Sequence, residues 1–317
     1  MDHLELHILG SNSAIPLSNR SPSAQFLSIA NQHFLIDCGE GTQVKLRKHK
    51  IGFGRIDHIL ISHLHGDHFY GLVPLLTTLH LLDRRKELHI YGPAELEEAV
   101  MHLLSFSGSR LRYPLVFHRL SPNKKGLVWE NEKIQVHSFP VKHSIDCWGF
   151  LFEEKELPRK FKPEMMEQYP IPTSEIRKIK AGEDWRSLDG ELVPNETLTD
   201  PPAPALSYAY CTDTAPIKHL HRYFKGVNLL YHEATFTEEH RKRAHETKHS
   251  TAKQAAEMAL LTESKELILG HFSVRYENLD ELLTEAQTLF PKAKLGLEGC
   301  KIRLHRNNTR SETLKAY

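Results

Sequence analysis

The sequence predicts an α/β protein, an αββα sandwich in which two sheets pack face to face and helices cover their outer sides. Short β-like runs dominate the first half of the chain, whereas strand-like and helix-like segments alternate in the second half. The chain has 317 residues, and its 40% hydrophobic content suffices for a substantial core. We therefore expect a single large domain over residues 1–317, interrupted by one insertion.

Apolar alternation and helical periodicity define the expected elements. In the first half, strands are expected at residues 4–9, 34–37, 58–62, 87–91, 133–138 and 148–152, and helices at 41–50, 69–82 and 94–105. After the insertion, strands are expected at 206–211, 227–231 and 266–269, and helices at 215–222, 250–261 and 279–290.

The segment 153–200 interrupts this pattern. It is rich in proline and carries 12 acids and 8 bases, which give it a formal charge of −4. Such a composition is typical of an inserted arm with little core of its own. Two basic clusters lie within it, at residues 159–162 and 177–180.

Overall composition excludes several classes of protein. The 41 Lys and Arg nearly balance the 40 Asp and Glu, and a formal charge of +1 argues against coating nucleic acid or membranes by bulk electrostatics. The four cysteines form no CxxC pair and suit a reducing compartment; they are Cys38, Cys147, Cys211 and Cys300. The polar N-terminus is unlike a signal peptide, and no apolar stretch approaches the ~18 residues of a membrane span. We expect a cytoplasmic protein with no membrane segment.

The strongest chemical signal is the run His63-Leu64-His65-Gly66-Asp67-His68, which follows the expected strand 58–62. The pattern His-x-His-x-Asp-His is expected only about 0.004 times in a shuffled chain of this composition. His63, His65 and Asp67 share the alternation that points side chains of an extended chain to one side. Gly66 allows the backbone to turn and to bring His68 to the same place. Imidazoles and a carboxylate suit Zn²⁺ or a similar first-row metal; the alternative is a surface histidine cluster at a strand end.

Further ligands are expected from other strand ends, because four ligands within one turn favour division between two metal ions. The candidates are His143, Asp213 and His271, each of which follows an expected strand. For each of them taken alone, a structural role is the alternative. Spacing by itself does not choose among the 22 histidines.

The run at residues 63–68 resembles the metal-binding motif of the metallo-β-lactamase superfamily. Other blocks resemble one branch of it, the ribonuclease Z family of tRNA 3′-processing endonucleases. These blocks are Asp37-Cys38-Gly39-Glu40-Gly41-Thr42-Gln43, His232-Glu233-Ala234-Thr235-Phe236, His249-Ser250-Thr251-Ala252 and Gly270-His271-Phe272-Ser273-x-Arg275-Tyr276. The first motif indicates only the superfamily, whereas the His-Glu-Ala-Thr-Phe and His-Phe-Ser-x-Arg-Tyr blocks select ribonuclease Z. The similarity extends from residue 3 to about residue 305.

The resemblance implies a metallo-β-lactamase fold with two Zn²⁺ ions per subunit, although the same ligands accept Mn²⁺ or Co²⁺. The implied ligand sets are His63, His65 and His143 for one ion, Asp67, His68 and His271 for the other, and Asp213 as a bridge between them.

The resemblance also implies roles in proton transfer and in phosphate binding. Asp67 would accept a proton beside the attacking water. Glu233 and His249 would protonate the leaving 3′ oxygen, with structural roles near a helix start as the alternative. Ser273 and Arg275 are candidates for phosphate contacts, and a pairing with an acid in the core is the alternative for Arg275.

The implied activity is zinc-dependent endonucleolytic cleavage of the 3′ trailer from precursor tRNA by a homodimer, leaving a 3′-hydroxyl on the tRNA and a 5′-phosphate on the trailer. The arm would be an exosite for tRNA, and its candidate RNA contacts are Arg177, Lys178 and Lys180. However, the arm lacks the family's Gly-Pro motif, and residues 10–16 depart from the usual Gly-Thr-Gly start. The alternatives are a small-molecule phosphodiesterase or other hydrolase on the same scaffold, and a non-catalytic RNA-binding or metal-storage protein.

Overall fold

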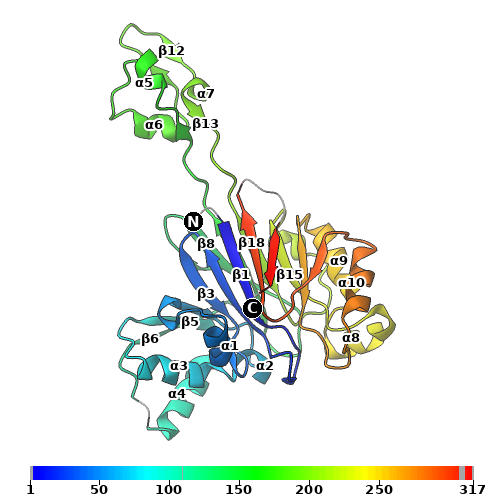
Figure 1. The fold of residues 1–317 in the computed structure, drawn as a ribbon. Helices are drawn as coiled ribbons and strands as arrows, with labels where there is room; N and C mark the ends of the chain where they lie inside the picture. The colour runs from blue at the N-terminus through cyan, green and yellow to red at the C-terminus, as the bar shows by residue number, and fades with distance from the viewer. Residues whose placement is uncertain (1–2, 109, 307–310, 316–317) are drawn as a thin grey trace.

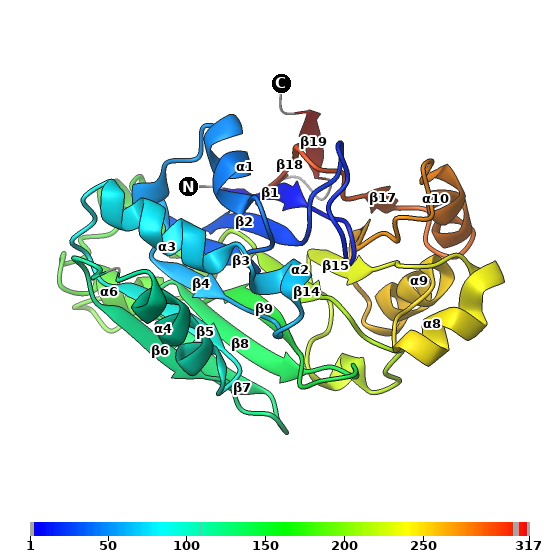
Figure 2. The same cartoon turned by 90° about the horizontal axis from the view of Figure 1, so that it is seen from below.

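Two mixed sheets lie face to face at the centre of the protein, with helices on both outer sides (Figures 1 and 2). The computed structural model describes residues 3–108, 110–306 and 311–315. The predicted αββα sandwich is confirmed by this arrangement.

The first sheet contains, within the described residues, eight strands in the order β19-β18-β1-β2-β3-β4-β5-β6. They are β1 (His3–Gly10), β2 (Ala24–Ile29), β3 (Gln32–Ile36), β4 (His58–Leu60), β5 (Leu88–Gly92), β6 (Leu115–Arg119), β18 (Cys300–His305) and β19 (Glu312–Lys315). The helices on its outer side are α1 (Thr42–Lys48), α3 (Leu72–Leu81) and α4 (Leu96–Phe106), as Figure 2 shows. Each buries an apolar stripe against the sheet, for example Leu76 of α3 and Val100 of α4.

The second sheet has seven strands in the described part of the chain, in the order β17-β16-β15-β14-β9-β8-β7. They are β7 (Gly126–Glu130), β8 (Ile134–Pro140), β9 (Trp148–Glu154), β14 (Ser207–Cys211), β15 (Leu229–Glu233), β16 (Leu267–Gly270) and β17 (Ala293–Leu295). Helices α8 (Arg241–Thr247), α9 (Ala252–Leu261) and α10 (Asp280–Gln287) lie on its side of the molecule (Figure 2). No helix among the residues that the structure describes is long and apolar enough to span a bilayer.

The core between the sheets is made of alternate residues from both. Leu6 and Phe34 of the first sheet and Phe152 and Tyr208 of the second belong to one buried cluster. The rings of Phe34 and Phe152 lie 5.0 Å apart in an edge-to-face contact. This packing fixes the position of one sheet relative to the other.

The direction of the strands places many loops at one end of the sandwich. Strands β3 to β6 are mutually parallel, and so are β14 to β17. Carboxyl ends of parallel strands meet at one edge of a sheet, which is where ligands bind in α/β proteins.

Two local expectations are wrong. The helix expected at 215–222 is reduced to the 3₁₀ turn Leu220–Arg222, and the backbone N–H of Ala215 bonds to the carbonyl of Lys142 in the neighbouring loop. Asp67 does not continue an extended chain from His63, since it lies in the short helix α2 (Gly66–Phe69). The sequence analysis also missed several strands and helices; they are β2, β6, β7, β17, β18, β19, α2 and α8.

The arm projects from the sandwich on two extended segments (Figure 1). Its elements are β10 (Lys160–Phe161), α5 (Met165–Gln168), α6 (Ile176–Lys180), β11 (Trp185–Arg186), β12 (Leu192–Val193), α7 (Asn195–Leu198) and β13 (Thr199–Asp200). The arm buries a small apolar cluster of its own, formed by Ile171, Ile179, Trp185, Val193 and Leu198. These residues are far apart in sequence, and the short helices and hairpins collect them. The Asn195 side chain adds bonds to the carbonyls of Ile179 and Glu183.

Candidate metal centre

The predicted ligands from both sheets meet at one end of the sandwich. His63 and His65 come from the loop after β4, and His143 comes from the loop after β8. Asp213 follows β14, and His271 directly follows β16. The structure thus brings together residues separated by more than two hundred positions in the sequence, such as His68 and His271.

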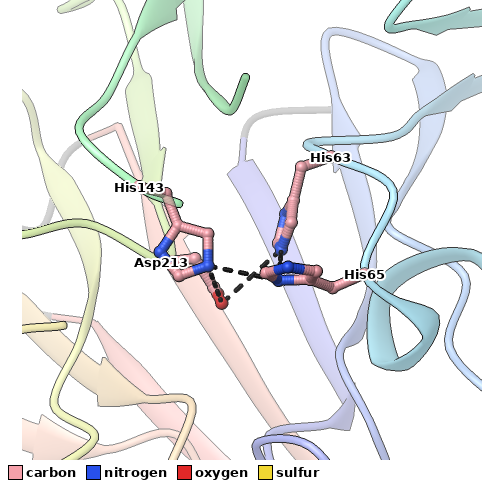
Figure 3. Close-up of side chains that lie close together, drawn as sticks. All are labelled: His63, His65, His143 and Asp213. Carbon is pink, nitrogen blue, oxygen red and sulfur yellow. Dashed lines mark hydrogen bonds and ion pairs between the residues drawn. The ribbon is translucent and has the colours of Figure 1, made fainter. Parts of the chain in front are cut away.

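One group consists of three histidines and a carboxylate oxygen, and Figure 3 shows their side chains pointing toward one another. His65 Nδ1 lies 3.0 Å from His63 Nε2 and 3.2 Å from His143 Nε2. Asp213 Oδ2 lies 3.6 Å from each of these two Nε2 atoms. Ligands at the usual bond length around a tetrahedral Zn²⁺ are separated by about 3.3 Å, so these spacings suit one ion.

A second group lies beside the first and contains Asp67, His68 and His271. The Nε2 atoms of the two histidines are 3.3 Å apart, and Asp67 Oδ2 lies 3.5 Å and 3.4 Å from them. Asp213 Oδ1 is 3.2 Å from both Nε2 atoms. One oxygen of Asp213 therefore faces each group, which is the geometry of a bridging carboxylate.

Buried acceptors orient the histidine rings. His68 Nδ1 donates to Asp37 Oδ2 at 2.7 Å, and the hydroxyls of Ser62 and Tyr210 donate to the same oxygen. His143 Nδ1 donates to the Lys248 carbonyl at 3.2 Å. In each case the bond at Nδ1 leaves Nε2 free for a metal, as is usual for ligating histidines.

The electrostatics of the two groups favour cations. Burial lowers the pKa of His63, which keeps the imidazole neutral and able to bind metal. Burial also acts to lower the pKa of His68, but the negative charges of Asp213, Asp67 and Asp37 outweigh burial and raise the pKa of His68 well above the ordinary value. Three carboxylates in a buried space need compensating positive charge, and divalent metals would supply it. The donor atoms present thus fit a pair of divalent metal ions.

Three site residues hold the left-handed backbone conformation that favours glycine. Asp37, Asp213 and His271 have φ values of 56°, 40° and 57°. Such conformations are unfavourable for residues with a Cβ and persist where the surrounding structure determines them. All three residues follow a buried strand, and the left-handed backbone conformation directs each side chain toward the site.

Glu233 and His249 form a pair beside the metal ligands. Glu233 Oε1 accepts a bond from His249 Nδ1 at 2.9 Å, and Glu233 itself is fully buried at the end of β15. Burial acts to lower the pKa of His249, but the negative charge of Glu233 and its hydrogen bond prevail and raise the pKa to about 9. His249 is therefore protonated at neutral pH. It also lies close enough to Asp213 and His271 for the three to hold an ion, so its role needs a test of its own.

A cleft of about 740 Å³ opens above the predicted metal ligands. Its lining includes His65, Asp67, His143, Asp213, His249 and His271 together with residues 13–16 of the loop after β1. The backbone N–H of Ala14 donates to Asp67 Oδ2 at 2.7 Å. The cleft has the size of a typical ligand site and brings any bound phosphate next to both groups of ligands.

The remaining predicted contact residues do not line this cleft. Ser273 is buried, and its Oγ accepts a bond from the backbone N–H of Arg275 at 3.4 Å. The Arg275 guanidinium lies over the Phe236 ring, 5.4 Å from its centre, and not beside an acid. Arg177, Lys178 and Lys180 lie on α6 in the arm, away from the metal ligands (Figure 1).

Sequence reasoning missed several residues that support the site. Asp37 and Gly39 were noticed only as part of a glycine-rich block, although a carboxylate after a buried strand is itself a signal. A Cβ on Gly39 would lie 2.5 Å from the Asp67 carbonyl oxygen, so this glycine allows the segment to pack against α2. Thr235 Oγ1 bonds to both Glu233 Oε2, at 2.5 Å, and His271 Nδ1, at 3.0 Å. No spacing rule reveals a contact of this kind.

Comparison of the sequence with known proteins gives full-length matches. A curated protein named Ribonuclease Z from Bacteroides thetaiotaomicron is 44% identical to this chain over 305 residues, which cover 96% of each chain. Another protein of that name, from Porphyromonas gingivalis, is 43% identical over 290 residues, which cover 92% of this chain and 95% of the relative. Residues 4–160 also match a family described as Anti-Pycsar protein Apyc1; the matched range contains strands β1 to β9, which belong to both sheets, and ends at β10 of the arm.

Comparison of the structure with solved structures gives the same fold. Human tRNase Z, short form, superposes with a TM-score of 0.69 at 26% identity, covering 94% of this chain and 98% of that chain. A metallo-β-lactamase fold protein from Bacillus subtilis has a TM-score of 0.68 at 16% identity, covering 96% of this chain and 100% of its own. The second match shows the fold alone.

Proposed function

The chain belongs to the ribonuclease Z family, and on that premise we propose that it is a zinc-dependent endoribonuclease that removes the 3′ trailer from precursor tRNA. It would leave a 3′-hydroxyl on the tRNA and a 5′-phosphate on the trailer. The observation that carries the proposal is the bridging position of Asp213, with one oxygen toward each histidine group, next to the Glu233–His249 pair. We place the reaction in the cytoplasm, which accords with the free, buried thiols of Cys38, Cys147 and Cys211.

The metal-binding roles follow from the two groups. We assign His63, His65 and His143 to one Zn²⁺, and Asp67, His68 and His271 to the other, with Asp213 shared. Two such ions lower the pKa of a water molecule and stabilise both oxygens of an in-line displacement at phosphorus. The protein's contribution is to hold the ligands before substrate arrives, through Asp37 and the other Nδ1 acceptors.

We assign Asp67 to proton acceptance at the attacking side. Its Oδ2 faces His68 and His271 and accepts the Ala14 N–H. The two histidines outweigh the effect of burial and hold the pKa of Asp67 well below its usual range. The carboxylate is therefore ionised at neutral pH, and its position on the cleft wall lets it accept the proton that an attacking water loses.

His249 serves the other end of the reaction. When water attacks the phosphate, the bond from phosphorus to the 3′ oxygen breaks and that oxygen needs a proton. His249 is protonated, lines the cleft and is held through Nδ1 by Glu233, so its Nε2 proton can be delivered to the leaving oxygen. Burial acts to raise the pKa of Glu233, but His249 and its hydrogen bond prevail and lower that pKa; Thr214 N–H and Thr235 Oγ1 also donate to the carboxylate.

The arm is our proposed exosite for tRNA. The two basic clusters that lie apart in the sequence are neighbours in space, because the Arg159 N–H bonds to the Lys180 carbonyl. Lys178 is paired with Glu175, and Lys162 lies 3.8 Å from Asp200. Arg177 is exposed and has no ion-pair partner among the residues that the structure describes, which leaves it free for phosphate.

We also propose that the protein acts as a homodimer through an apolar groove on α3 and α4. The groove has a volume of about 610 Å³ and is lined by Phe69, Tyr70, Val73, Pro74 and Leu103. Tyr70 is 67% exposed and Leu103 is 52% exposed, which is unusual for a monomer surface. Tyr70 lines the metal cleft as well, so a second copy seated here would border the site of cleavage. Sedimentation measurements that show only monomer would contradict this assignment.

The function is tested by incubating the purified protein with a 3′-extended tRNA and, separately, with bis(p-nitrophenyl) phosphate. We expect a single cut in the tRNA after the discriminator nucleotide, loss of cutting on chelation, and recovery with Zn²⁺. Asp67→Ala provides the inactive control. Hydrolysis of the small diester without any cut in tRNA would instead establish a small-molecule phosphodiesterase.

A further inference from the structure

A second pocket adjoins the metal cleft. It has a volume of about 520 Å³ and shares His143 and Ser144 with the cleft, so the two spaces meet at a metal ligand. Its other walls come from the loop after β8 and from residues 216–219 and 223. None of the roles assigned above uses this pocket.

The walls of the pocket carry positive charge and an aromatic ring. Lys142 and Lys218 line it, and neither has an ion-pair partner among the residues that the structure describes. Asp146 is the one acid among the lining residues. The Tyr223 ring is half-buried, stacks on Phe139 with ring centres 5.5 Å apart and contributes to the wall.

The pocket exists because the chain here is not a helix. The Ala215 N–H bonds to the Lys142 carbonyl, and the Lys142 N–H bonds to the Thr214 hydroxyl, so one backbone bond and one side-chain bond join the two lysine-bearing loops. Between Ala215 and Lys225 the sequence contains no acid, and Lys218 is exposed. The joined loops therefore each contribute one lysine to the lining of a pocket that shares His143 with the metal cleft.

We propose that this pocket binds one nucleotide of single-stranded RNA next to the scissile phosphate, with a backbone phosphate between Lys142 and Lys218 and the base against Tyr223. The proposal rests on the proposed function. A phosphate held by lysines positions a strand without reading its sequence, and a base stacked on an aromatic ring adds affinity for any base. The volume suits a ligand of nucleotide size. The first trailer nucleotide and the discriminator nucleotide offer the pocket the same phosphate and base, and the experiment distinguishes which of the two is bound.

The experiment measures single-turnover cleavage of a 3′-extended tRNA by the zinc-loaded full chain as a function of salt. Lys218→Glu should lower kcat/KM about tenfold at moderate salt, and removing one contact to a single strand should reduce the slope of log kcat/KM against log salt by about 0.7. Lys265→Glu is the matched control: the same charge change on an exposed lysine at the opposite end of β16. It should leave both quantities at the wild-type value.

Abasic substitutions identify the bound nucleotide. With wild-type protein, an abasic site at the position that occupies the pocket, either the first trailer nucleotide or the discriminator nucleotide, should lower kcat/KM several-fold. With Tyr223→Leu, the intact substrate and the substrate that is abasic at that position should be cleaved equally well. Equal losses for Lys218→Glu and Lys265→Glu, or an unchanged salt slope, would overturn the proposal. If the wild-type protein cuts no precursor tRNA, it is the proposed function that fails.

Discussion

The metal cleft and the arm are built in opposite ways. The cleft gathers residues from nearly the whole sequence onto strand ends of two packed sheets, and its ligands are fixed by buried partners such as Asp37 and Thr235. The arm is one continuous segment with a small core of its own, and two extended segments connect it to the sandwich (Figure 1). Under the proposed function, the chemistry depends on the sandwich, whereas recognition of a large substrate is assigned to a separate projection. Four substitutions, described from the largest expected effect to the smallest, test this division.

Asp213→Ala should cause the largest loss, because it removes one ligand from each metal group at once. We expect the cleavage rate to fall about 10⁴-fold or more. Metal analysis of the purified variant should show fewer than two ions per chain. A variant that keeps both ions and its activity would show that the bridging assignment is wrong.

His249→Ala separates proton delivery from metal binding. The variant should keep its metals, and cleavage of precursor tRNA should fall by about 10²- to 10⁴-fold. The loss should be much smaller with bis(p-nitrophenyl) phosphate, whose leaving group is stable as an anion and needs no proton. His245→Ala, an exposed histidine in the same region, is the control. Loss of metal from His249→Ala would identify it as a ligand with Asp213 and His271.

Asp37→Asn removes the negative charge and one of the two acceptor oxygens of the side chain that orients His68, while keeping its shape. Loss of such a partner should lower metal affinity about 10- to 100-fold. Competition with a chromogenic chelator measures the affinity directly. Tyr210→Phe, which removes only a donor to Asp37, should have a smaller effect; an equal effect would mean that packing rather than ring orientation is responsible.

Arg306→Met tests the attachment of the arm. The Arg306 guanidinium binds Glu154 through both Nη atoms, at 2.5 Å and 2.6 Å, and also bonds to the Pro204 carbonyl. It therefore joins the two segments that lead to and from the arm. We expect KM for precursor tRNA to rise several-fold, with little change for the small diester.

Glu154 would be left buried and unpaired in that variant, which costs about 3–5 kcal/mol of stability. The double variant Glu154→Gln/Arg306→Met should recover thermal stability without recovering KM. Recovery of both would show that Arg306 matters only for folding. Fluorescence transfer between labels on the arm and on the sandwich reports the position of the arm directly.

The sequence predicted the general fold and the grouping of the site better than its details. Strand ends could be placed from buried apolar runs, so His143, Asp213 and His271 could be named as candidates together with residues 63–68. The left-handed backbone at Asp213 and His271 could not be foreseen, because tertiary packing imposes it. Likewise, the helix expected at 215–222 gave way to backbone bonds with the neighbouring loop, and local propensity contains no information about such contacts.

The arm marks the other limit of sequence reasoning. Its prolines and charges suggested a segment with little core of its own, and they did not indicate that Trp185, Ile179 and Leu198 are buried together. Composition averages over the segment, whereas the core depends on a few apolar residues brought together by hairpins. The negative formal charge of the segment likewise gave no indication that its two basic clusters lie next to each other, joined by the bond between the Arg159 N–H and the Lys180 carbonyl.

The most direct test of the account compares the intact chain with one in which a short glycine-rich linker replaces the arm. The backbones of Glu154 and Leu206 are hydrogen-bonded to each other, so a short linker can join the two ends. Both proteins are given a 3′-extended tRNA and bis(p-nitrophenyl) phosphate, and the cut in the tRNA is mapped. We predict that the intact chain cuts after the discriminator nucleotide, and that the shortened chain still hydrolyses the small diester but loses at least about 10²-fold in kcat/KM for tRNA. Equal activity of both proteins on tRNA, or no cut by the intact chain, would contradict the account.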